Sequence, residues 1–176
     1  WTAKLPQGAK ELTIMTSMGL TKRPALMLPN ADGIYDTVKI YKSKKEAEPL
    51  VTLHPGVMSE VFMDVAVKED GKSYQVARLA RILDLAEDGS HLRLWLGGGL
   101  DNENDWVWHP HELLKEVVDN VGHFTAASNT SGTDARLSRE MTLDSWEVYC
   151  QWQADVFNYF IQEDKYDVIF SHLHNV

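Results

Sequence analysis

Hydrophobic and polar residues alternate in short runs through the first half of the chain. The clearest run is IYDTVKIYKS at 34–43, where successive side chains would fall on opposite faces, as in a β-strand. Apolar runs at 11–18 and 49–56 predict two further strands. We expect residues 22–33 to be mostly loop, because they contain two prolines and an Asn-Ala-Asp-Gly cluster.

A β-hairpin is predicted between residues 61 and 85. Two β-rich runs, 61–67 and 74–85, flank the sequence Glu-Asp-Gly-Lys, and an Asp-Gly pair supplies the positive φ that a tight turn requires. The second run also has partial helical spacing, but a strand is favoured because the run leads directly to another strand at 91–96. The three runs together predict an antiparallel meander.

The apolar period becomes helical after residue 109. Residues 110–121 place leucines and valines on one face, with Pro110 in the first turn and Gly122 at the C-terminal cap. Residues 143–163 predict a longer amphipathic helix, capped at its start by Thr142 or Asp144. A strand at 166–173 follows, as in proteins whose helices feed a parallel sheet.

These elements predict an α+β fold. It has a mainly antiparallel β-sheet, two amphipathic helices and a C-terminal strand that would join a larger α/β sheet. We expect two parts: a β-rich region at 1–138 with one helix near 110–121, and a helix-strand segment at 139–176. The chain begins without Met and its last strand ends at a polar cluster, so we expect it to be a piece of a longer protein.

The charge and the cysteine content limit the classes of partner and the compartment that fit this chain. The net charge of −9 argues against nucleic acid and against an anionic membrane, since both attract basic surfaces. A single cysteine, Cys150, allows no internal disulfide, which fits a reducing compartment, and we expect the cytoplasm. No stretch approaches the roughly 18 apolar residues of a membrane span.

The candidate chemistry is concentrated at the end of the chain. His172 and His174 are two residues apart, so in a strand they would point to the same side and converge on one metal or one phosphate. Zinc requires three or four protein ligands, so this pair alone is incomplete. The alternative is that one histidine packs under a loop and the other faces water. The chain contains no complete catalytic constellation.

The closing segment YDVIFSHLHNV at 166–176, with the helix before it, resembles bacterial members of the alkaline phosphatase superfamily. The similarity is to the type I phosphodiesterase and nucleotide pyrophosphatase-like branch. In that family the strand delivers an Asp and then a Gly-His to a two-metal centre, and a large β-containing cap lies between the halves of the metal site. The resemblance implies that residues 1–138 form the cap and that the metal-binding Asp follows Val176.

The resemblance also implies a function for the parent protein. The parent would hydrolyse a phosphate ester of a small molecule with two divalent metal ions, expected to be zinc, and this chain would be inactive alone. No metal ligand or nucleophile would lie in this chain. His172, His174 and Asn175 would bind substrate or support the metal ligands. The remaining partners would be the rest of the parent chain and, for the isolated piece, a second copy of itself.

Two alternatives remain open from the sequence. The chain could be a free-standing soluble binding domain without catalysis, using the tryptophans near 106–108 as contacts. It could also be a small metalloenzyme that uses some of its seven histidines. Retention of metal by the purified chain would favour the metalloenzyme.

Overall fold

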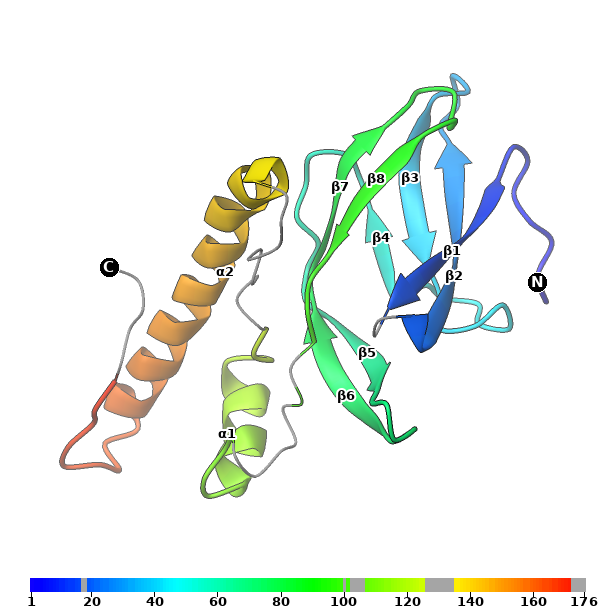
Figure 1. Ribbon diagram of the computed structural model, residues 1–176. Coiled ribbons are helices and arrows are strands. Elements are labelled where there is room, and N and C mark those ends of the chain that lie inside the picture. Colours follow the sequence, from blue (N-terminus) through cyan, green and yellow to red (C-terminus); the bar gives the residue numbers. More distant parts are fainter. Residues whose placement is uncertain (17–18, 100, 102–106, 126–134, 172–176) are drawn as a thin grey trace. The chain divides into compact units, whose positions relative to one another are not determined.

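The computed structural model describes residues 1–16, 19–99, 101, 107–125 and 135–171, apart from the side chains of 137, 138 and 142. Its contacts divide the chain into two compact units, Trp1–Gly97 and Gly98–Val176. Among the described residues, the strands all lie in the first unit and the helices in the second (Figure 1). The expected α+β class, mainly antiparallel, is confirmed. The division falls at Gly97, whereas the sequence pattern placed it at 138.

Four strands of the first unit form an antiparallel sheet in the order β1-β2-β3-β4. Their bounds are β1 Lys10–Thr16, β2 Thr21–Pro29, β3 Tyr35–Ile40 and β4 Val51–Leu53. The runs at 11–18, 34–43 and 49–56 therefore do contain strands, and β3 and β4 are shorter than the runs that predicted them. β3 and β4 expose part of one face and bury the other, which is the basis of the period-two signal.

Strand β2 corrects the prediction of a loop at 22–33. Its two prolines lie where the sheet loses few hydrogen bonds. Pro24 faces Tyr41, one residue beyond the end of β3, and its carbonyl still accepts the Tyr41 amide at 2.9 Å. Pro29 ends the strand, where the register with β3 shifts. Proline is tolerated at such strand ends and irregularities.

Two hairpins complete the first unit. Strand β5 (Phe62–Val67) pairs with β6 (Ser73–Arg78), and β7 (Ala80–Leu85) pairs with β8 (Leu92–Leu96). The predicted Asp-Gly turn is present, with Gly71 at φ 82°. The single strand expected at 74–85 is instead broken at Leu79, whose carbonyl accepts the Gly97 amide at 2.8 Å. The hairpins therefore form two separate sheets and not one meander.

The hydrophobic core of the first unit joins the four-stranded sheet to both hairpins. Alternate residues of β2 and β3 face residues from β4, β5 and β7, and together they form one buried cluster. Its members are Ala25, Met27, Val38, Ile40, Leu53, Phe62, Ala80 and Ile82. A buried ionic cluster of Arg23, Asp64 and Arg78 lies beside it and links β2 to β5 and β6.

The second unit contains α1 (Glu112–Asn120) and α2 (Ala135–Gln162). The helix expected near 110–121 is therefore present, and Gly122 follows it with φ 121°. Helix α2 begins at Ala135 and not near 143, so Thr142 and Asp144 lie inside it. Residues 135–141 are mostly strong helix formers, and Arg136 pairs with Glu140 one turn later, which explains the earlier start. No helix in the described ranges is long and apolar enough to cross a membrane.

The strand expected after α2 is not formed over the described residues 166–171. Asp164 has φ 52° and ends the helix in a turn. Val168 and Phe170 are 67% and 95% exposed. No strand among the described residues pairs with this segment, and a lone strand lacks the ladder hydrogen bonds that stabilise it.

Candidate functional site

The residues singled out by the sequence, His172, His174 and Asn175, lie outside the described part of the chain. The convergence of His172 and His174 on one metal or one phosphate therefore stays a prediction. Within the described residues, no three His, Cys, Asp or Glu side chains gather to hold a metal ion. The candidate binding sites among the described residues are cavities within the separate units.

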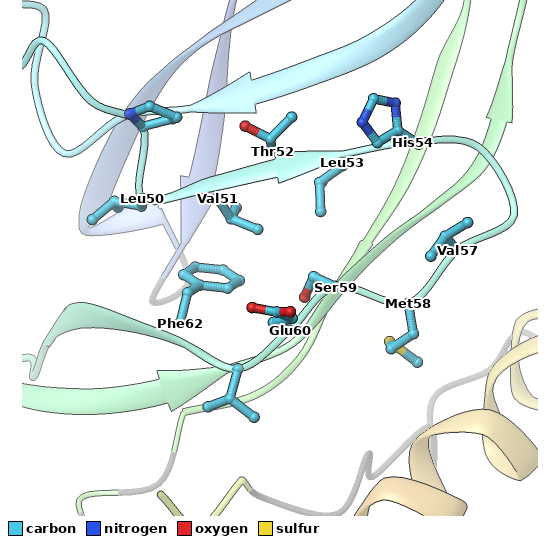
Figure 2. A pocket seen from close by; sticks show the side chains of 12 residues that line it. Leu50, Val51, Thr52, Leu53, His54, Val57, Met58, Ser59, Glu60 and Phe62 are labelled. Atoms are coloured by element: carbon cyan, nitrogen blue, oxygen red, sulfur yellow. The ribbon is translucent and has the colours of Figure 1, made fainter. Parts of the chain in front are cut away.

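A pocket of about 480 Å³ lies beside β4 in the first unit (Figure 2). One side is β4 with the residues that flank it, and the other is the segment that leads from β4 into β5. The described lining residues are Pro49, Leu50, Val51, Thr52, Leu53, His54, Val57, Met58, Ser59, Glu60, Val61 and Phe62. This volume is within the usual range of small-molecule sites.

The second side of the pocket is held in place by β7. The Gly56 amide donates to the Ile82 carbonyl at 3.3 Å, and the Ser59 amide donates to the Ala80 carbonyl at 2.9 Å. The Ala80 amide donates back to the Ser59 hydroxyl at 2.9 Å. These bonds fix the segment after Pro55 along the edge of β7, so the pocket has two walls with independent supports.

The floor of the pocket is apolar. In Figure 2, Val51 and Leu53 point from β4 toward the segment that carries Ser59 and Glu60. Thr52 and His54 lie on the opposite side of the strand, as expected from the alternation of side chains along β4. Leu53 and Phe62 are only 2% and 8% exposed and belong to the core. The pocket is thus an opening onto the core of the first unit.

Three of the four polar side chains at the pocket, those of Ser59, His54 and Glu60, differ in what they already bind. The Ser59 hydroxyl accepts the Ala80 amide. His54 Nδ1 lies 3.2 Å from the Asp36 carbonyl oxygen and 3.4 Å from Thr37 Oγ1, which orients the ring. Glu60 is exposed, and among the described residues it forms no ion pair or hydrogen bond. Glu60 is therefore the one lining carboxylate with unused binding capacity.

The second unit has an aromatic cluster instead of a polar site. Trp152 makes edge contacts with Phe124 and Trp108, and its Nε1 donates to the Gly122 carbonyl at 3.1 Å. Trp108, expected from the sequence to be an exposed contact residue, is partly buried, and its Nε1 has no hydrogen-bond partner among the described residues. Trp106 lies outside the described residues. The cluster joins α2 to the segments on both sides of α1.

A smaller apolar pocket of about 220 Å³ lies near the end of α2. It is lined by Leu113, Phe160, Tyr166, Val168, Ile169 and Phe170. Close by, Glu116 accepts hydrogen bonds from Tyr159 at 3.0 Å and from Lys165 at 2.9 Å. The bond from Lys165, together with that from Tyr159, lowers the pKa of Glu116. These contacts tie α1 to the end of α2.

No protein-family model, curated protein or solved structure matches the chain. Sequence reasoning did not identify the pocket beside β4, because no motif marks residues 57–62. The available signal was a loop with three apolar residues, Val57, Met58 and Val61, in a stretch bounded by strands. Apolar residues in a short connection indicate that the connection covers the hydrophobic core or lines a cavity.

Proposed function

We propose that this chain belongs to a metal-dependent phosphodiesterase or phosphatase of the alkaline phosphatase superfamily, and that its β-rich part serves as the cap. The proposal is carried by YDVIFSHLHNV at 166–176, preceded by a long amphipathic helix. That combination resembles the type I phosphodiesterase and nucleotide pyrophosphatase-like branch.

The exposed segment after α2 supports this proposal. Val168 and Phe170 are apolar residues in a segment without helix or strand, and they face solvent. Burial of such side chains stabilises a protein by about 1.5–3 kcal/mol each. In the proposed parent, residues 166–173 form a strand of the α/β core, and neighbouring strands cover these side chains. The remainder of the parent chain is therefore the proposed partner; an isolated piece would use a second copy.

The core of the β-rich unit, residues 1–97, supports the role of a cap. A cap contributes to catalysis by shaping the substrate cavity and excluding water from it. The β-rich unit has a hydrophobic core that joins its four-stranded sheet to both hairpins, and such a core can support the wall of a substrate cavity. The substrate of the parent is proposed to be a phosphate ester of a small molecule.

The metal centre is assigned to the parent and not to this chain. Two divalent ions, expected to be zinc, require a set of His and carboxylate ligands, and the resemblance implies that this set lies outside residues 1–176. We place the ligands and the nucleophile in the rest of the parent, so this chain alone is inactive. His172, His174 and Asn175 are proposed to bind substrate or to orient metal ligands. The proposed location is the cytoplasm.

The reading frame and the activity of the full-length protein test this function. We expect Asp directly after Val176, then Gly-His, and a later Asp-His pair. The full-length protein should hydrolyse bis(4-nitrophenyl) phosphate, lose activity on chelation and recover it with zinc. A different residue after Val176, or a full-length protein without metal-dependent phosphoesterase activity, would remove the proposal.

Single alanine variants test the two terminal histidines in the full-length enzyme. We expect His172→Ala or His174→Ala to lower kcat/KM by about 10- to 100-fold, the usual effect of losing a group that supports metal ligands. His91→Ala, which changes an exposed histidine of the β-rich unit, is the matched control. Wild-type kinetics in both terminal variants would contradict these roles and leave the cap assignment intact.

A further inference from the structure

We propose that the pocket beside β4 binds an organic cation: an ammonium or guanidinium group attached to an apolar body. The inference rests on the walls, floor and charge of this pocket. It goes beyond the phosphodiesterase proposal and does not depend on it.

The walls and floor set the nature of the ligand's body. Leu53 and Phe62 form a floor that is continuous with the core, and Val51 points into the same space. Val57 and Val61 border the opening and are 61% and 39% exposed. Exposed apolar side chains around an apolar floor gain free energy when an apolar group displaces water from them. An aromatic or branched alkyl group fits this surface.

Glu60 sets the sign of the ligand's charge. The described lining residues include one carboxylate and no lysine or arginine. Some carboxylates of the first unit have cationic partners: Glu11 pairs with Lys44, and Asp64 pairs with Arg23 and Arg78. Glu60 has no such partner among the described residues. A ligand that covered Glu60 without a positive charge would remove its hydration without replacing it, which is costly.

The other polar groups of the pocket do not change this assignment. The Ser59 hydroxyl already accepts a hydrogen bond from the Ala80 amide. The His54 ring contacts Asp36 and Thr37 on the far side of β4. A phosphate or carboxylate would meet Glu60 with no lysine or arginine among the described lining residues to neutralise it. The pocket therefore favours a cation and disfavours an anion.

Three probes of nearly equal shape test the assignment on the 176-residue chain. They are the 2-phenylethylammonium ion, neutral 2-phenylethanol and the phenylacetate anion. Methyl NMR spectra of Val51, Leu53 and Val57 should shift on titration with the ammonium ion at neutral pH. We expect its affinity to exceed that of the alcohol by about fivefold, the scale of one partly exposed ion pair, and to fall with added salt. Phenylacetate should bind weakest.

Two variants separate the role of Glu60 from that of the apolar floor. Glu60→Gln should abolish the preference for the ammonium ion over the alcohol. Its methyl NMR spectrum should remain that of a folded protein. Glu87→Gln, which removes an exposed carboxylate elsewhere in the unit, should keep the preference. Equal binding of cation and alcohol, no binding of any probe, or a preference that survives in Glu60→Gln would overturn the proposal. Binding of a neutral extended peptide in place of the cation would also overturn it.

Discussion

Arg23 and Asp64 form a buried ion pair between β2 and β5, with Nε of Arg23 2.7 Å from Oδ1 of Asp64. The second oxygen of Asp64 accepts Nε–H of Arg78 at 3.0 Å. The carbonyls of Val65 and Gly97 accept further guanidinium hydrogens at 2.9 and 2.7 Å. One carboxylate thus holds strands of two different sheets together, and a buried group with such partners is costly to lose.

Replacement of Asp64 should expose that cost. Asp64→Asn leaves two buried arginines without their shared anion, and we expect a loss of about 3–5 kcal/mol in the free energy of unfolding. Urea denaturation followed by tryptophan fluorescence measures it. Glu87→Gln removes an exposed carboxylate and should stay within about 0.5 kcal/mol of wild type. Equal stability of the two variants would show that the ionic cluster contributes little.

A pair of glycines separates backbone strain from steric overlap. Gly71 and Gly89 have φ of 82° and 64°, so alanine at either position must adopt a left-handed conformation that costs about 1–2 kcal/mol. A Cβ at Gly71 meets nothing within 4 Å, whereas at Gly89 it would lie 2.9 Å from the Tyr35 ring. Gly89→Ala should therefore be clearly more destabilising than Gly71→Ala in urea denaturation. Similar losses would mean that Tyr35 moves aside freely.

The core can be tested at Ile82. This side chain is 1% exposed, and its truncation in Ile82→Ala should lower the free energy of unfolding by about 2–5 kcal/mol. Ile34→Ala makes the same chemical change at a residue that is 38% exposed, and we expect a loss below about 1 kcal/mol. If both variants unfold at the same urea concentration, the assignment of Ile82 to a tightly packed core is wrong.

The stability of the second unit should depend on pH through Glu116. The hydrogen bond from Lys165, and then that from Tyr159, lowers the pKa of Glu116 below its ordinary value of 4.5. A carboxylate with a lowered folded pKa stabilises the fold above its unfolded pKa, and this stabilisation is lost as pH falls through the folded pKa. Wild type should therefore exceed Glu116→Gln in stability at neutral pH.

This difference should shrink as the pH falls below about 4.5 and vanish once Glu116 is protonated in both states. Urea denaturation followed by far-UV circular dichroism, which reports the helices, measures it at each pH. Glu147→Gln on the exposed face of α2 controls for the loss of one surface charge. A difference between wild type and Glu116→Gln that does not change with pH would exclude the carboxylate as its source.

The sequence predicted those elements whose pattern has a local cause. In β3 and β4 the most buried residues alternate with partly or fully exposed ones, and α1 follows a helical apolar stripe that ends before Gly122. Strand β2 was not predicted, because Pro24 is tolerated only through its position opposite Tyr41 just beyond β3. That position depends on the register of the sheet, which no local pattern contains.

The candidate site was less accessible to sequence reasoning than the fold. The pocket beside β4 depends on hydrogen bonds from Gly56 and Ser59 to β7, more than twenty residues later in the chain. Such long-range contacts decide whether a short apolar connection lines a cavity or covers the core. The terminal histidines were predicted from spacing in a strand, and that interpretation remains a prediction.

The glycines after β8 have a practical consequence. Gly97 is fixed through its amide to Leu79 and through its carbonyl to Arg78, whereas a side-chain atom at Gly98 would meet nothing within 4 Å. Gly97 is therefore the last residue of the first unit and is still hydrogen-bonded within it. A fusion of residues 1–97 to another protein, with the joint directly after Gly97, should therefore fold as an independent unit.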